Sequence, residues 1–275
     1  IEGEVMLSVK INKLGKILFL LLLVISLNKF NYSAAAQKKE VTKNKYYIIG
    51  VSSNNVPFEM EKNKKYSGID IELLEEISKI EGFGIIWKPM DDRQLIENLE
   101  SGKLDGIMDR TVTYNNSDAN VDFSDSYFSS GAVGVARVDN IYVNSVENFK
   151  GKMFGVVKNT EDEAYANSIR KKNEALVVPY EDILSLSKDL IDGELDIAFM
   201  DYPLVYYINN QNDSVKLKVL TEKIDEKKIV FEVKRGSNPE LIQMFNDGLQ
   251  KIKDSGKYYE IIQKYIGDGT FGYGN

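Results

Sequence analysis

The residues best placed to do chemistry follow a short apolar run near the middle of the chain. The run, residues 104–108, is closed by Asp109, Arg110 and Thr111, a pattern typical of a buried strand that ends at a polar edge. Ligands of open parallel sheets bind outside the carboxyl ends of the strands. We therefore expect Asp109 and Arg110 to face a binding crevice; the alternative is that they are solvated loop residues.

The composition excludes several kinds of catalytic site. The chain has no cysteine and no histidine, which removes thiol nucleophiles, Cys/His metal clusters, histidine bases and Ser-His-Asp triads. Its formal net charge of -7 disfavours nucleic acid or an anionic membrane surface as a partner. It has 16 tyrosines and 12 phenylalanines, but no basic stripe accompanies them, so we do not expect a nucleic-acid stacking platform.

The N-terminal segment has the pattern of a secretory signal. Lysines precede the apolar run 17–27 and the small-residue stretch 33–36, as in a signal peptide. The apolar run is short for a helix that spans a bilayer, although an uncleaved anchor is the alternative. We predict a signal peptide with its upstream residues over 1–36 and a disordered leader over 37–45. Since no cysteine offers a lipid attachment site, we expect a soluble periplasmic protein.

Strand and helix patterns alternate along the rest of the chain, and the same order repeats after residue 150. A glycine that stops a helix directly before a strand occurs in both halves, at 102–105 and at 193–196. This alternation predicts right-handed parallel units and therefore an α/β fold. The predicted strands are 46–51, 84–87, 104–108, 153–157, 175–178 and 195–200, and the predicted helices are 69–80, 95–99, 161–171, 183–191, 239–252 and 258–266.

Two segments rich in β-branched residues, 131–138 and 222–233, are predicted to cross between two lobes. The chain then leaves the first lobe and returns to it, where we expect Asn238 to cap a helix that has Pro239 at its first position. The predicted domains are a first lobe of 46–133 with 231–267, a second lobe of 134–230 and a flexible tail of 268–275.

Short motifs in a fixed order resemble those of a known family. They are Val56-Pro57-Phe58, Gly68-Ile69-Asp70, 102–105, 121–127 with Ser130-Gly131, 148–155 with Thr160, 196–201 and 255–259. In this order they resemble the extracellular solute-binding proteins of polar amino acid ABC transporters, over residues 46–267. The resemblance implies a two-lobed type II periplasmic-binding fold, in which each lobe is a mostly parallel sheet flanked by helices and two hinge crossovers join the lobes.

The resemblance also implies a function. An amino acid or similar small polar solute would be captured between the lobes by hinge closure, and the membrane permease of the transporter would read the closed form. The protein would then be a monomer and not an enzyme, with no cofactor and no metal. Two alternatives stay open, namely a diverged sensor or receptor module with an altered or absent ligand, and a periplasmic dehydratase on the same fold.

One acidic site residue is indicated twice. Asp201 matches the family's acidic residue that pairs with the α-ammonium group of the ligand. It also stands at the carboxyl end of the predicted strand 195–200, where a ligand of an open sheet would bind. The alternative is that Asp201 is a loop acid that caps the segment at Pro203.

A second site residue has a competing structural role. Thr160 matches the family's threonine that receives the ligand's carboxylate at a helix start. However, Thr160 and Glu163 also form a T-x-x-E capping box, which would occupy the hydroxyl group. Glu161 and Asp162 would oppose an anion at that helix end, although both suit the helix dipole.

Further positions depart from the family pattern. Ser117 stands where the family places an arginine that clamps the α-carboxylate, and Arg110 is either its substitute or a solvent-facing arginine. Asn55 and Asp92 replace aromatic residues, which makes the pocket more polar; the alternative for Asp92 is a helix N-cap. Because acidic and basic residues converge on the crevice, a small zwitterionic, polar or cationic solute fits better than an apolar one.

Overall fold

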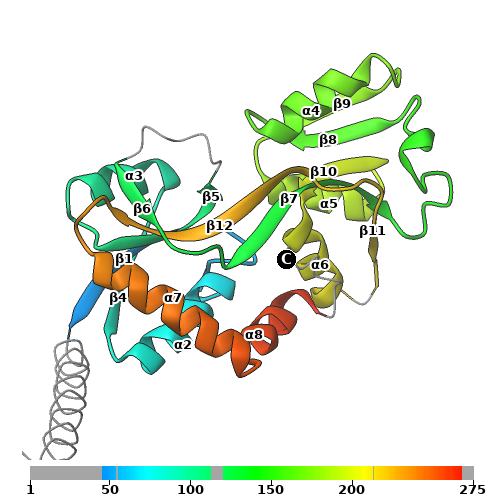
Figure 1. Cartoon of the computed structure of the whole chain (residues 1–275). Coiled ribbons are helices and arrows are strands. Elements are labelled where there is room, and N and C mark those ends of the chain that lie inside the picture. The colour runs from blue at the N-terminus through cyan, green and yellow to red at the C-terminus, as the bar shows by residue number, and fades with distance from the viewer. Residues whose placement is uncertain (1–44, 54, 113–119, 213, 268–275) are drawn as a thin grey trace, which may run out of the picture. The chain divides into compact units, whose positions relative to one another are not determined.

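The computed structural model describes residues 45–53, 55–112, 120–212 and 214–267, and contacts divide the chain between residues 45 and 46. The predicted signal peptide, the tail and all but the last residue of the leader lie outside these ranges. The elements of the first half (Figure 1) are β1 (Tyr46–Ser52), β2 (Met60–Lys62), β3 (Lys65–Ser67), α2 (Ile69–Glu81), β4 (Gly84–Met90), α3 (Asp92–Glu100), β5 (Gly106–Val112), β6 (Val121–Phe123) and β7 (Phe128–Arg137).

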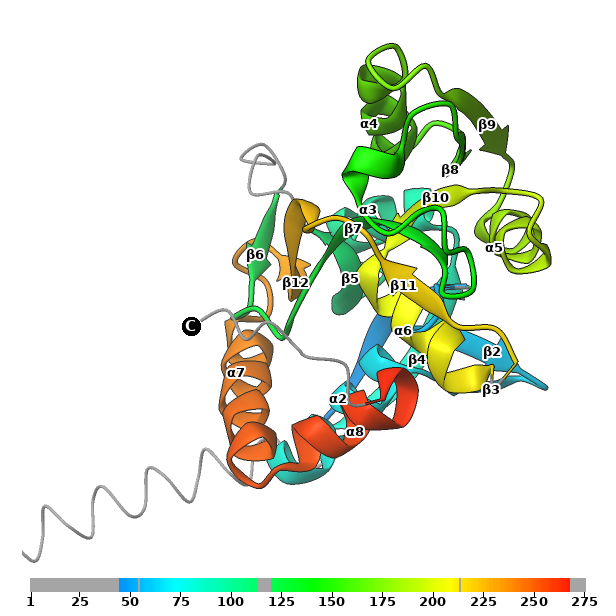
Figure 2. The ribbon, with the colours of Figure 1, turned by 90° about the vertical axis from the view of Figure 1, so that its right-hand side faces the viewer.

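The second half repeats the alternation of strands and helices, and the chain then returns to the strands of the first half through β12. Its elements are the 3-10 turn η1 (Val146–Asn148), β8 (Met153–Val157), α4 (Glu161–Arg170), β9 (Leu176–Tyr180), α5 (Ile183–Asp192), β10 (Ile197–Asp201), α6 (Tyr202–Gln211), β11 (Leu217–Val219), β12 (Ile224–Lys234), α7 (Pro239–Asp254) and α8 (Lys257–Ile266). Figure 2 shows the same elements from the side, with α7 and α8 beside α2.

A 10-stranded sheet connects both halves. Eight of its strands follow the order β4-β1-β5-β12-β7-β10-β8-β9, while β6 pairs with β12 and β11 pairs with β7. β1 pairs in parallel with β4 and β5, and β8 pairs in parallel with β9 and β10. Between these parallel sections, β12 and β7 run antiparallel to their neighbours and to each other. The fold is therefore α/β, with two parallel sections joined by two crossing strands, as predicted.

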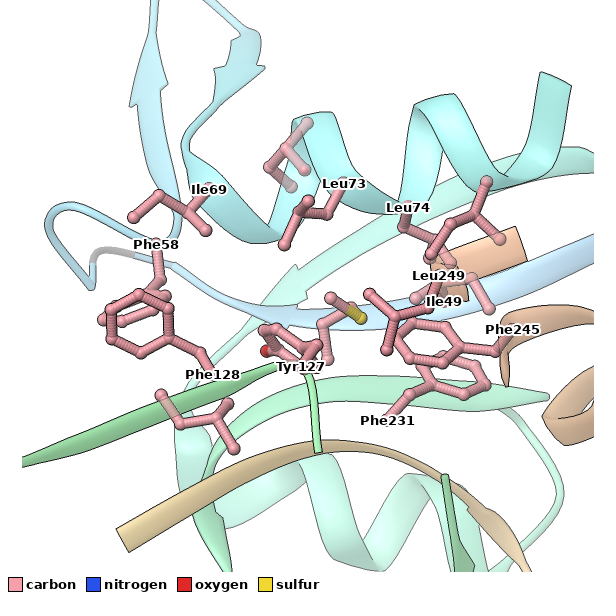
Figure 3. Close-up of a cluster of buried hydrophobic side chains, with 14 of the residues drawn as sticks. Ile49, Phe58, Ile69, Leu73, Leu74, Tyr127, Phe128, Phe231, Phe245 and Leu249 are labelled. Atoms are coloured by element: carbon pink, nitrogen blue, oxygen red, sulfur yellow. The ribbon is translucent and has the colours of Figure 1, made fainter. Parts of the chain in front are cut away.

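The first parallel section has a core made from both ends of the described chain. Residues of β1, α2 and β7 pack there against residues of β12 and α7 (Figure 3), and residues of α8 join the same cluster. The rings of Phe231 and Phe245 stack with centroids 5.0 Å apart, and Phe58 meets Phe128 edge to face at 5.3 Å. Since burial of one such side chain stabilises a fold by about 1.5–3 kcal/mol, the C-terminal elements are integral to this core.

The second section has cores of its own. One forms around Val133, Leu186 and Leu190, and the other around Phe149, Phe154 and Phe199. Helix α6 joins this part of the protein to the first core, because its Tyr206 and Tyr207 pack against clusters on both sides. The amide nitrogen of Asn210, on the same helix, donates to the backbone oxygens of Lys264 and Tyr265 in α8, at 3.2 Å each.

The repeated glycine joint has the same geometry in both halves. Gly102 and Gly193 adopt φ angles of 76° and 86°, in the left-handed region that favours glycine. The aspartate three residues later bonds to the neighbouring parallel strand in each case. Asp105 Oδ2 accepts a hydrogen bond from the N–H of Ile48 at 2.8 Å, and Asp196 Oδ2 accepts one from the N–H of Met153 at 3.0 Å.

The structure corrects several sequence predictions. The strand predicted to end at Met108 continues to Val112, because β12 pairs with β5 along this stretch. Helix α6 and the β2-β3 hairpin were not predicted. Asn238 occupies the cap position of α7, but its side chain makes no capping hydrogen bond. Instead, its amide nitrogen donates to the backbone oxygen of Asp105 at 3.2 Å.

Candidate ligand site

Asp201 ends strand β10 at the start of helix α6. Its backbone is extended (φ -60°, ψ 133°), and its side chain makes no capping hydrogen bond to α6. The alternative that Asp201 caps the segment at Pro203 is therefore wrong. The residue is partly buried and lies opposite Ala132 of β7, so its carboxylate stands at the carboxyl end of the strand, where the sequence placed it.

The crossing strands bring a lysine onto the face of the sheet that carries Asp201. Ala132 of β7 is paired with Asp201, and Ser130, two residues earlier, is paired with Lys227 of β12. Side chains of paired residues share a face, as do residues two apart on one strand. Asp201, Ser130 and Lys227 therefore lie on one face, at the junction of the two sections of the sheet.

Thr160 is the N-cap residue of helix α4, and its hydroxyl group bonds to the backbone of residues on both sides of it. Its hydroxyl oxygen accepts a hydrogen bond from the N–H of Glu163 at 3.3 Å, and its hydroxyl group donates to the backbone oxygen of Val157 at 2.6 Å. In return, Glu163 Oε2 accepts from the N–H of Asn159 at 2.8 Å. The capping interaction predicted for the T-x-x-E sequence is thus present, with the glutamate bonded one residue before the cap.

An ion pair that the sequence did not predict joins α4 to the crossing strand. Lys227 Nζ bonds to Glu161 Oε2, with side chains that are 24% and 56% exposed. Glu161 is the first residue of α4, so the first turn of this helix adjoins the face with Asp201 and Ser130. The two partners lie far apart in the sequence, and no local pattern signals their contact.

A second group of charges surrounds the start of β12. Lys223 Nζ lies 5.0 Å from the ring centroid of Tyr202 and 3.7 Å from Glu226 Oε1. The hydroxyl of Ser129 donates to the same Glu226 oxygen at 2.5 Å. This hydrogen bond, followed by the nearby Lys223 charge, lowers the pKa of Glu226. Burial raises the pKa of the Tyr202 phenol, which keeps that hydroxyl neutral.

Asn55 and Asp92 follow β1 and β4, as the sequence predicted. Asn55 is partly buried, and its backbone oxygen accepts hydrogen bonds from the N–H groups of Phe58 at 2.7 Å and Glu59 at 2.9 Å. Asp92 is the first residue of α3, and the cap is Asp91, whose Oδ1 accepts from the N–H of Arg93 at 3.2 Å. The N-cap alternative for Asp92 is therefore wrong.

For the remaining predicted site residues, the structure describes either the backbone alone or nothing. Asp109 and Arg110 belong to β5, with Asp109 opposite Val230 of β12, so they are strand residues and not loop residues. Ser117, and the side chains of Asp92, Asp109 and Arg110, lie outside the described part of the chain.

A surface hollow lies elsewhere, between α2, β3 and α8. It has a volume of about 290 Å³, and both lysines and glutamates line it. Lys264 and Glu72 form an ion pair across it, and the hydroxyl of Tyr265 bonds to the same glutamate. These contacts hold α8 to α2, which gives the hollow a structural explanation.

The two parallel sections and the two crossing strands that join them form a two-lobed periplasmic-binding fold of type II. The model of the bacterial extracellular solute-binding proteins, family 3, matches residues 47–268. The chain therefore belongs to this family.

Known relatives agree with this assignment. A probable histidine-binding protein of Campylobacter jejuni is 26% identical over 217 residues, which cover 79% of this chain and 83% of the relative. Substrate binding domain 2 of Lactococcus lactis GlnP, in an open conformation, is 29% identical with a TM-score of 0.72, over 81% of this chain and 95% of that domain. An ancestral amino acid-binding protein, described as a precursor of cyclohexadienyl dehydratase, is 25% identical with a TM-score of 0.62, over 80% of this chain and 95% of that protein.

The matching family is one of extracellular solute-binding proteins, and a relative in Escherichia coli is named a lysine/arginine/ornithine-binding periplasmic protein. Within the residues that the structure describes, the helices are too short or too polar to cross a bilayer.

Proposed function

We propose that this protein is the substrate-binding component of an ABC importer. It captures an amino acid or a similar small polar solute between its lobes, with the ammonium group of the solute on Asp201. The observation that carries this proposal is the position of Asp201 in a member of this family. Its carboxylate ends a parallel strand at the junction of the two sections and is not used to cap the helix that follows.

The proposed lobes are residues 46–133 with 231–267, and residues 134–230. The separate hydrophobic clusters support this division, since one draws on both ends of the described chain and the others draw on its middle. β7 and β12 would serve as the hinge, and the closed form would be read by a membrane permease. We further propose that the protein acts as a monomer, exported by its N-terminal signal peptide to the periplasm.

Calorimetric titration of the purified protein with a panel of amino acids and small amines tests the proposal. A charge-assisted hydrogen bond contributes about 1.5–3 kcal/mol, so Asp201→Asn should weaken binding by about ten-fold to a hundred-fold. Asp192→Asn is the matched control, because it removes the same charge from an exposed ion pair with Lys188 in α5. Absence of binding by every member of the panel would contradict solute capture.

The enzymatic alternative has one observation in its favour. A binding protein described as a precursor of a dehydratase shares this fold, at the similarity given above. We nevertheless infer a binding protein, because the relatives named above are a probable histidine-binding protein, a substrate binding domain and an ancestral amino acid-binding protein. Incubation with prephenate, the substrate expected for a dehydratase of this type, decides the matter: turnover that Asp201→Asn abolishes would favour the enzyme.

A further inference from the structure

Helix α4 adjoins the proposed binding face with its N-terminal end. The unsatisfied N–H groups and the dipole of a helix N-terminus attract anions, including the carboxylate of a ligand. The ion pair between Glu161 and Lys227 brings this end of α4 to the face that carries Asp201. The charges and hydrogen bonds of the first turn of α4 therefore determine whether a solute carboxylate can bind here.

In this protein the first turn already holds an anion of its own. Glu161, Asp162 and Glu163 are all acidic. The Glu161 carboxylate is paired with Lys227. An incoming carboxylate would meet the like charge of Glu161 and would have to compete for the ammonium group of Lys227.

The hydroxyl group at the start of the helix is also engaged. Thr160 uses its hydroxyl oxygen as acceptor for the N–H of Glu163 and its proton as donor to the backbone oxygen of Val157, at 3.3 and 2.6 Å. A ligand carboxylate would gain a hydrogen bond from Thr160 only by breaking the bond to Val157. Neither the hydroxyl nor the lysine is thus available to a carboxylate without the loss of an existing contact.

We propose that Glu161 is a specificity-determining residue, and that the bound solute is an amine or guanidine without a carboxylate group, an inference that rests on the proposed function. The ammonium or guanidinium group is held by Asp201. Glu161, with Lys227 as its counter-ion, excludes the α-carboxylate that distinguishes an amino acid from its decarboxylated amine.

Matched pairs of ligands test this inference directly. The probes are arginine with agmatine and lysine with cadaverine, because each pair differs by one carboxylate and keeps the same distal cation. Calorimetric titration of the purified protein should show the amine binding at least about ten-fold more tightly than its parent amino acid in one or both pairs. Tighter binding of the amino acid in the pairs that bind would overturn the inference.

A charge-neutral variant tests whether Glu161 causes the preference for the amine over the amino acid. Glu161→Gln removes the repulsion and leaves Lys227 able to pair with a ligand carboxylate, so the affinity for the parent amino acid should rise about ten-fold and the preference for the amine should shrink. Asp192→Asn, which loses an equal charge on the same lobe, should leave the preference unchanged. An unchanged preference in Glu161→Gln would overturn the assignment to this residue.

The outcomes separate this inference from the function on which it rests. If amino acids bind to the unmodified protein and their amines do not, solute capture stands and the inference falls. If neither member of any pair binds, while other solutes of the wider panel do, the inference falls and solute capture again stands. Thermal unfolding of both variants without ligand checks that each retains the fold.

Discussion

Replacement of Thr160 by alanine should destabilise the protein in the absence of any ligand. The substitution removes the long cap hydrogen bond to the N–H of Glu163 (3.3 Å) and the short one to the backbone oxygen of Val157 (2.6 Å). Loss of a threonine N-cap costs about 0.5–2 kcal/mol, and the second hydrogen bond adds about 0.5–1.5 kcal/mol. Thr160 is exposed, so water replaces part of both interactions. We expect a total loss of about 1–2 kcal/mol.

Urea unfolding, followed by circular dichroism, measures this loss as a lower midpoint with an unchanged slope. Thr160→Ser keeps the hydroxyl and should retain most of the stability, which makes it the matched control. The reasoning would be refuted if Thr160→Ala unfolded at the same urea concentration as the unmodified protein. A large loss of ligand affinity in that case would show that the hydroxyl serves the ligand and not the helix.

Two further changes test contacts within the first and the second parallel section. Asp105→Ala removes the acceptor of the Ile48 N–H and should lower the free energy of unfolding by about 1–3 kcal/mol, whereas Asp105→Asn, which keeps an acceptor oxygen, should lose less in the same urea titration. Burial, together with the hydrogen bond to Asp189, raises the pKa of Tyr180 to about 12. Because the unfolded phenol titrates near pH 10, this stabilisation is complete below about pH 10 and is lost as the pH rises towards 12. Melting temperatures between pH 9 and 12 should fall more steeply for the unmodified protein than for Tyr180→Phe, and equal slopes would contradict the shift.

Much of the fold was predictable because it follows local rules. Apolar spacing located the helices α2, α3, α4, α5, α7 and α8, and the glycine stops at Gly102 and Gly193 marked where strands begin. Helix α6 escaped prediction because its buried residues do not form a single stripe, and Pro203 in its first turn suggested a loop. The extent of β5 depended on its antiparallel partner β12, which lies more than a hundred residues later in the chain.

The candidate site was predictable only in part, for a related reason. Asp201 could be placed because the end of a parallel strand is recognisable in the sequence. The capping box at Thr160 is also local, and the structure contains it. The contact between Glu161 and Lys227 depends on how the crossing strand passes α4, so no spacing rule within either segment reveals it.

The composition of the first core has a consequence for the order in which the protein can be made. Its side chains come from residues 47–128 and from residues 229–266, whereas the buried members of the second and third clusters all lie between residues 133 and 217. As the chain emerges with its N-terminus first, the second and third clusters have all their members before the first cluster does. The core that residues 47–128 begin is therefore finished last, when the residues of α7 and α8, up to Ile266, arrive to cover it.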